Sequence, residues 1–222
     1  MSIDERKIYI VKLLQEQVID QRDSLREWKE ITEQAAQIDT GYIAQHLVSL
    51  ITSIPGSGMR GKGDDLADTS EVKSANFIDS LDKKGAVAPR WNFSSNDMRT
   101  MTKYLEVPFI YLVSMDLNSN DAFRVRVWKL NPREHKDFNA RYLEWMEVLG
   151  KPKLKNPNRP AINFQLFPPR FKEDDNYARH GNGRSNGFDK LKVFLEEVHG
   201  SKKILHAEEV NDQIEILFID AN

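Results

Sequence analysis

The stretch of sequence that decides the fold runs from residue 64 to residue 73 and reads DDLADTSEVK. It combines adjacent acids, a short spacer and an acid-x-lysine triplet. Successive side chains of an extended strand alternate between its two faces, so Glu71 and Lys73 are expected on the same face. A turn over residues 67–70 would fold one of the preceding aspartates back beside Glu71. The spacing therefore predicts two carboxylates and one lysine on a shared surface.

Two aspartates compete for the first position of this arrangement. Asp65 is the first choice, because Leu66 follows it and supplies an anchor in the core. Asp64 stays open as an alternative metal ligand, because a shift of one residue reverses which aspartate faces the metal. Asp68 is interpreted as a turn residue. Two carboxylates at this spacing would hold a hard divalent cation such as Mg²⁺ through oxygen ligands and leave water molecules on it.

The combination of residue types suits the hydrolysis of a phosphodiester bond. That reaction needs a nucleophilic water, a positive charge beside the developing phosphate oxygens and help for the leaving oxygen. A bound Mg²⁺ supplies positive charge and activates water. Lys73 would either stabilise the attacking hydroxide and the phosphate oxygens or carry a proton, and the sequence leaves both roles open. The competing interpretation is a solvated hairpin with a surface ion pair between Glu71 and Lys73, which contributes little stability.

The pattern Asp65…Glu71-Val72-Lys73 resembles the D…(D/E)xK signature of the restriction-endonuclease-like superfamily, PD-(D/E)xK. Residues 63–76 are similar to the metal-site hairpin of small type II restriction enzymes such as PvuII, and the short spacer resembles that of the mismatch-repair nickase MutH. The chain also resembles the MamI group of restriction enzymes. The resemblance covers residues 40–80 and implies a metal-dependent nuclease core with Asp65, Glu71 and Lys73 as its catalytic residues. Gln45 and His46 lie on the preceding helix, where this superfamily often places a polar residue near the metal, although helix-surface hydrogen bonding is the simpler interpretation of both.

Length and composition limit the remaining possibilities. The chain has 222 residues and no cysteine, so thiol chemistry and cysteine-based zinc sites are excluded. We expect one substantial core, with residues 1–38 as a helical extension that is a candidate dimerisation surface and residues 39–222 as the nuclease and DNA-recognition domain. The start of the chain lacks the apolar segment of a signal peptide, and no apolar run is long enough for a membrane helix. A cytoplasmic protein without a membrane partner is therefore expected.

The charge of the chain is unevenly distributed. The net charge is −2, but residues 123–192 contain 16 basic and 8 acidic residues, whereas residues 193–222 contain 2 basic and 7 acidic residues. The basic middle of the chain could face phosphates, so the near-neutral total does not exclude a nucleic-acid partner. An ordinary solvated basic surface is the alternative.

Apolar periodicity predicts a mixed order of helices and strands. Helices are expected at 4–37 (as two helices broken near 20–24), 40–53, 95–105 (capped by Ser94 or Ser95), 132–149 and 188–199. Strands are expected at 70–78, 108–116, 122–130, 161–167, 204–206 and 214–219. Residues 89–93 and 170–187 are expected to be loops, and residues 151–160 a basic linker rich in proline.

Arginine, lysine and asparagine side chains in this basic region are the types that contact phosphates and base edges. The loop at 170–187 contains such residues among glycines, which would let the backbone approach DNA closely, although an unliganded surface loop explains its turns equally well. The candidate DNA-binding residues are Arg60, Lys62, Arg90, Asn92, Arg124, Arg126, Arg179, Asn182, Arg184 and Asn186.

The sequence thus predicts an α/β fold with a restriction-endonuclease-like core, a mixed central sheet flanked by helices, and an N-terminal helical extension. The expected activity is that of a type II restriction endonuclease making Mg²⁺-dependent, sequence-specific double-strand cuts in DNA. One centre per chain implies a homodimer on a palindromic or interrupted-palindromic site. The alternatives are a repair nickase of the same superfamily and a DNA-binding protein without catalysis.

Overall fold

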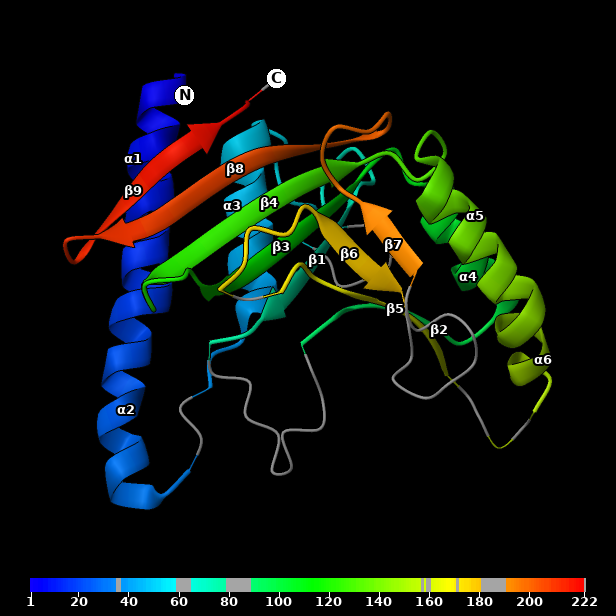
Figure 1. Ribbon diagram of the computed structural model, residues 1–222, viewed down its shortest axis with the longest axis horizontal. Coiled ribbons are helices and arrows are strands. Elements are labelled where there is room, and N and C mark those ends of the chain that lie inside the picture. The colour runs from blue at the N-terminus through cyan, green and yellow to red at the C-terminus, as the bar shows by residue number, and fades with distance from the viewer. Residues whose placement is uncertain are drawn as a thin grey trace.

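The computed structural model describes residues 1–34, 37–58, 65–78, 89–156, 158, 161–170, 172–180 and 191–221. Figure 1 shows two β-sheets with helices on either side, and the predicted α/β class with a mixed central sheet and N-terminal helices is confirmed. Among the residues described, no helix is both long enough and apolar enough to cross a membrane.

The central sheet has five strands in the order β1-β3-β4-β8-β9. Strand β1 pairs in parallel with β3, and the other neighbours are antiparallel, so the sheet is mixed. Within the described chain, β1 has one strand neighbour and lies at the edge of this sheet. The bounds are β1 Glu71–Asn76, β3 Ile110–Leu117, β4 Phe123–Leu130, β8 Ser201–Val210 and β9 Gln213–Ile219.

A second, four-stranded antiparallel sheet was not predicted. Its order is β2-β5-β6-β7, with β2 Trp91–Ser95, β5 Ile162–Phe167, β6 Tyr177–His180 and β7 Leu191–Phe194. The predicted loop at 89–93 and the predicted helix at 188–199 were therefore wrong, and β6 lies inside the predicted loop at 170–187. These short segments become strands because they pair with one another, in the case of β2 and β5 across a long sequence distance, and local periodicity does not report such pairing.

Two N-terminal helices cover one face of the five-stranded sheet. Helix α1 (Ile3–Leu14) and helix α3 (Thr40–Thr52) bury their apolar stripes against β1, β3, β4 and β8 to form the first core. The predicted helix at 40–53 is confirmed. The break expected near 20–24 was wrong, because a π-helical segment η1 (Gln15–Asp20) continues α1 into α2 (Gln21–Thr32). Residues 15–24 contain neither glycine nor proline, so nothing in them stops a helix.

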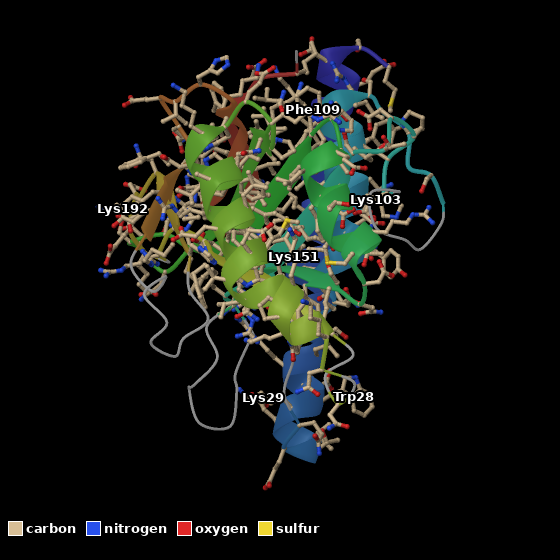
Figure 2. The ribbon with its side chains drawn as sticks, turned by 90° about the vertical axis from the view of Figure 1, so that its right-hand side faces the viewer. Trp28, Lys29, Lys103, Phe109, Lys151 and Lys192 are labelled. Carbon is tan, nitrogen blue, oxygen red and sulfur yellow. The ribbon has the colours of Figure 1, made fainter. Side chains whose placement is uncertain are left out.

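The N-terminal segment is divided in its environment. Ile10, Leu14 and Val18 are completely buried in the first core, whereas α2 has no buried residue. Figure 2 shows Trp28 and Lys29 on the part of α2 that extends beyond the body of the protein, and the Trp28 side chain is exposed. The first helix is therefore part of the core, and only the second has the character of an extension.

The opposite face of the five-stranded sheet packs on the four-stranded sheet and the remaining helices, α4 (Met98–Glu106), α5 (Lys136–Trp145) and α6 (Lys151–Leu154), with the π-helical segment η2 (Met146–Gly150) between the last two. Asp97 caps α4, in place of the expected Ser94 or Ser95, because its side chain accepts from the Thr100 N–H in a capping box. The helix expected at 132–149 starts later, at Lys136 after the cap His135, and the beginning of the expected linker is helical.

Candidate active site

Asp65 is fixed beside the start of β1 by hydrogen bonds on both sides. Residues 65–67 lie antiparallel to residues 55–57, since Ser57 N–H donates to the Asp65 carbonyl at 3.2 Å and Ala67 N–H donates to the Pro55 carbonyl at 2.9 Å. Its carboxylate accepts from Val72 N–H at 2.8 Å through Oδ2 and from the Gln45 amide at 2.8 Å through Oδ1. Asp65 therefore lies against both β1 and α3.

The turn that folds the chain back follows the predicted pattern. Thr69 N–H donates to the Leu66 carbonyl at 2.9 Å, and Thr69 itself has a positive φ of 69°. The Asp68 carboxylate accepts from the Ser70 N–H at 3.0 Å and from the Ser70 hydroxyl at 2.9 Å. Asp68 thus closes the turn through its side chain, as asparagine and aspartate commonly do.

Glu71 and Lys73 project from the same face of β1 and form an ion pair. The side chain of Glu71 is 2% exposed and that of Lys73 is 18% exposed. Val72 points the other way, into the first core. Because β1 pairs with β3 from Glu71 to Asn76, the strand that carries the acid-x-lysine triplet is held by a regular parallel ladder. The alternative of a solvated surface hairpin does not fit this burial.

Two aromatic rings form the wall behind the lysine. The Lys73 ammonium lies 5.4 Å from the ring centre of Tyr104 on α4 and 5.8 Å from that of Phe93 on β2, close enough for cation–π attraction. The two rings pack edge to face at 5.2 Å, and the Tyr104 hydroxyl donates to the Ser94 carbonyl at 3.1 Å. The second sheet and α4 therefore complete a site whose acids come from the first sheet.

The carboxylates of Asp65 and Glu71 both affect the pKa of the Tyr104 phenol. Burial raises the pKa of the Tyr104 phenol, and the negative charges of Glu71 and then Asp65 raise that pKa further. The phenol accordingly stays neutral at physiological pH. Asp65 and Glu71, which the sequence spacing predicted to lie together, thus both act electrostatically on the Tyr104 phenol.

The residues present suit a hard divalent cation. In the described part of the chain, no group of three or more histidine, cysteine, aspartate or glutamate side chains is placed to hold a metal. The site instead offers two carboxylates and the amide of Gln45, and Mg²⁺ is commonly bound by one or two carboxylates with water completing its shell. Each carboxylate oxygen has two lone pairs, so the hydrogen bonds of Asp65 leave acceptor capacity for a cation.

A hollow of about 390 Å³ opens beside this site. Asp65 and Gln45 line it together with Gly56, Gly58 and the α3 residues Tyr42, His46 and Ser49. Gly58 has a φ of +69°, a conformation that side chains with a Cβ rarely adopt. His46, for which helix-surface hydrogen bonding was the simpler interpretation, lines this space and contacts no acidic residue of the site in any hydrogen bond described.

The other residues predicted to bind DNA divide into three groups. Arg60, Lys62, Asn182, Arg184 and Asn186, with the alternative metal ligand Asp64, lie outside the described residues. Arg90 is partly buried just before β2, Asn92 is exposed on β2, and Arg179 is partly exposed on β6.

Arg124 and Arg126 form the third group and require a correction. They are 1% and 3% exposed, and both bind the completely buried Asp116 on β3. Arg124 contacts the two Asp116 oxygens at 2.9 and 3.1 Å, and Arg126 contacts one of them at 3.0 Å. The two arginines alternate along β4 with residues of the first core, and residues 173–175 before β6 contact them from the other side. These guanidinium groups form buried ion pairs inside the protein and are not positioned to contact DNA.

The two arginines tie the central sheet to the segment before β6. Arg124 also donates to the Asp174 carboxylate at 2.9 Å and to the Glu173 carbonyl at 3.0 Å, and Arg126 donates to the Asp175 carbonyl at 3.3 Å. The buried charges are thus paired and hydrogen-bonded, as buried charges must be. This contact fixes where β6 begins relative to the first sheet.

Sequence reasoning missed Phe93, Tyr104 and the arginine network as parts of this region. Phe93 belonged to a predicted loop, and Tyr104 belonged to a helix whose packing partner was unknown. The acid-x-lysine spacing carried no signal for either ring. Only the pairing of β2 with β5 and the position of α4 bring them to Lys73.

Comparison with known proteins finds a matching family and a related enzyme. A family model described as MamI restriction endonuclease matches residues 27–207. The chain is 35% identical over 185 residues to the type II restriction enzyme MamI of Microbacterium ammoniaphilum, an alignment covering 74% of this chain and 56% of that enzyme. The chain thus spans little more than half the length of this relative. No solved structure matches the chain.

Proposed function

The chain belongs to the MamI restriction endonuclease family, and we propose from this that it is a type II restriction endonuclease that hydrolyses phosphodiester bonds at specific sequences in double-stranded DNA. The observation that carries the proposal is the convergence of Asp65, Glu71 and Lys73 at the edge of the five-stranded sheet. These are the residue types that metal-dependent phosphodiester hydrolysis requires.

We assign the divalent cation, with Mg²⁺ as the natural ion, to the carboxylates of Asp65 and Glu71. Bound there, the cation would supply positive charge at the scissile phosphate and a more acidic water. In hydrolysis the water oxygen forms a new bond to phosphorus, the bond from phosphorus to the leaving oxygen breaks, and that oxygen gains a proton. Asp64, which lies outside the described residues, is the alternative ligand.

The chain's own residues support three parts of this chemistry. Gln45 and Val72 N–H hold the Asp65 carboxylate in one orientation, so it needs little rearrangement to bind a cation. Lys73 provides a positive charge where the phosphate oxygens become more negative. Phe93 and Tyr104 exclude water from one side of the lysine, which strengthens its electrostatic effect.

Cutting both strands of a duplex most simply calls for one centre for each strand. One chain offers one such centre, so we propose a two-fold homodimer that places the two centres on opposite strands of a palindromic or interrupted-palindromic site. Helix α2 is the surface we assign to this contact, since none of its side chains is buried within the chain.

The test is to incubate the purified protein with a large unmethylated DNA of known sequence in Mg²⁺ buffer, beside a Lys73→Ala variant. Discrete fragments that disappear with Lys73→Ala would support the proposal, and the fragment ends would give the site. Lys136→Ala on α5 is a matched control, because Lys136 is an exposed lysine outside the candidate site. Nicked circles from a monomer would indicate a nickase instead, and duplex binding without cleavage under any divalent metal would indicate a non-catalytic DNA-binding protein.

A further inference from the structure

Among the described strand residues of the four-stranded sheet, the outward-facing positions, which form its outer face, include no acidic residue. Its strands alternate regularly, with Trp91, Phe93, Phe164, Ala178 and Val193 pointing inward to the second core. The outward positions carry amides and cations, and the rest are hydroxyl or aromatic side chains. The amides and cations of this outer face are Asn92 on β2, Asn163 and Gln165 on β5, Arg179 on β6 and Lys192 on β7.

The amides lie side by side because of the pairing of β2 with β5. Asn92 lies opposite Gln165, and Ser94 lies opposite Asn163. The Asn92 amide donates to the Ser94 hydroxyl at 2.9 Å and to Asn163 Oδ1 at 3.4 Å, and Gln165 donates to Asn92 Oδ1 at 3.4 Å. The 3.4 Å contacts are long for hydrogen bonds, so a ligand with well-placed donors and acceptors could replace them at low cost.

The cations stand next to the amides along the same face. The Lys192 ammonium lies 4.1 Å from the ring centre of Tyr177, and the Arg179 guanidinium lies 5.8 Å from the same ring. Arg179 also contacts the Asp175 carboxylate at 3.4 Å and the Pro168 carbonyl at 3.2 Å, which fix its position. Figure 2 shows Lys192 projecting from the periphery of the protein.

The outer strands of the other sheet differ in charge. Strands β8 and β9 carry Glu208, Glu209 and Glu215, and Glu215 is exposed. Strand β8 also carries Lys202 and Lys203, but these cations are paired with Asp220 and Glu196. The four-stranded sheet combines positive charge, hydrogen-bonding amides and no acid among its outward strand residues, which is the combination that a duplex with phosphates outside and base edges in its grooves requires.

We propose that this outer face reads the base sequence of the DNA, with Asn92, Asn163 and Gln165 contacting base edges and Lys192 and Arg179 contacting flanking phosphates. A carboxamide offers a donor and an acceptor side by side, which matches the N6 and N7 atoms of adenine in the major groove. The inference rests on the proposed function, since it names the surface by which that enzyme selects its substrate.

Strand β2 links this surface to the candidate active site. Asn92 faces outward, while the next residue, Phe93, faces inward and contacts Lys73. A shift of β2 on DNA binding would therefore change the contact between Phe93 and Lys73. This arrangement gives the enzyme a direct structural route from base recognition to the cleavage centre.

The experiment uses Lys73→Ala protein, in which binding is separated from cleavage, to select sequences from a pool of randomised duplexes. Asn92→Ala, Asn163→Ala and Gln165→Ala are then added one at a time. Each is expected to weaken binding of the selected sequence about 5- to 150-fold, the loss of one bidentate base contact of roughly 1–3 kcal/mol, and to leave binding of unrelated duplexes unchanged. Gln213→Ala, an exposed amide on β9, is the matched control and should change neither.

Lys192→Ala tests the phosphate contact separately. It should weaken the binding of all duplexes alike and reduce the slope of log affinity against log salt concentration by about one. Unchanged discrimination in all three amide variants would overturn the inference, as would a failure of the Lys73→Ala protein to select any sequence. Absence of cleavage by the wild type would instead overturn the proposed function, and a selected sequence lost in the amide variants would still support the outer face as a DNA reader.

Discussion

The two sheets of this protein treat polar side chains in opposite ways. The five-stranded sheet buries Glu71, Asp116 and Arg124 almost completely and joins them to charged partners. The four-stranded sheet leaves Asn92 and Asn163 exposed, with contacts of 2.9–3.4 Å among neighbouring side chains. A buried charge must stay paired, so the first sheet has one fixed polar arrangement. Exposed amides can exchange partners, which suits recognition of a ligand.

This contrast assigns hydrolysis to the first sheet and selection of the DNA sequence to the second. Hydrolysis needs groups held in one geometry, and a rigid, buried edge strand provides that. Base reading needs groups that replace one set of hydrogen bonds with another. Changes in the first sheet should therefore affect cleavage rate or stability, and changes on the outer face of the second should affect sequence preference.

The largest effect is expected from Asp65→Asn. The substitution keeps the size of the side chain but removes a negative charge that we assign to the metal, so Mg²⁺-dependent cleavage should fall at least about 100-fold. Initial rates of plasmid cleavage at several Mg²⁺ concentrations measure this. Asp212→Asn, in the exposed turn between β8 and β9, should retain full activity. Equal activity of both variants would exclude Asp65 as a ligand and favour Asp64.

Asp116→Asn should cause the next largest change, in stability. It leaves the buried guanidinium groups of Arg124 and Arg126 without their shared counter-charge, at a cost of about 3–5 kcal/mol in the free energy of unfolding. Urea denaturation followed by circular dichroism measures this loss. Asp174→Asn is the control, because that side chain is 93% exposed and its ion pair should contribute about 1 kcal/mol or less. Similar losses in the two variants would contradict the view of Asp116 as the central tie.

Phe93→Leu tests the contact between the Phe93 ring on β2 and the Lys73 ammonium on β1. Losing one cation–π contact of about 0.5–2 kcal/mol should lower the cleavage rate constant roughly 2- to 30-fold, while the affinity for DNA stays the same. Single-turnover kinetics and a binding titration separate these quantities. Phe218→Leu, an exposed phenylalanine on β9, should leave both unchanged. A loss confined to affinity would mean that Phe93 acts through the outer face.

The smallest effect is expected at alkaline pH. Burial, followed by the charges of Glu71 and Asp65, raises the pKa of Tyr104 above the ordinary phenol value of 10.0. Its stabilising contribution is therefore fully present below pH 10 and is lost as the pH rises through the folded-state pKa, by up to about 1.4 kcal/mol per pH unit. Urea denaturation between pH 9 and about 11 should show a shallower decline for Tyr104→Phe than for the wild type. An identical decline would show that the phenol ionises as easily in the folded protein.

Several features could be predicted because they depend on neighbours in the sequence. The buried strands β3 and β4 follow from apolar runs, and α3 follows from its apolar period and the Pro55-Gly56 stop after it. The return of Asp65 to Glu71 depends on a short turn. Gln45, which the resemblance suggested near the metal and for which helix-surface hydrogen bonding was the simpler interpretation, contacts Asp65.

Other features could not be predicted because they depend on distant pairing. Arg124 and Arg126 alternate with apolar residues as exposed strand residues do, yet residues 173–175 before β6 contact them and Asp116 neutralises them. The sequence pattern at 191–194 predicted a helix, but this segment forms strand β7 because it pairs with β6. Local patterns carry no information about which face a remote segment will cover.

By itself the sequence determined the chemical identity of the candidate site. Two acids and a lysine at this spacing lie together in any chain that extends residues 71–73 as a strand and turns at 66–70, because strand alternation and turn geometry are local. Only the tertiary structure decided that Phe93 and Tyr104 enclose Lys73 and that Asn92 lies beside Gln165. Those neighbours come from segments 20 to 73 residues apart, and packing and strand pairing, which act through space, bring them together.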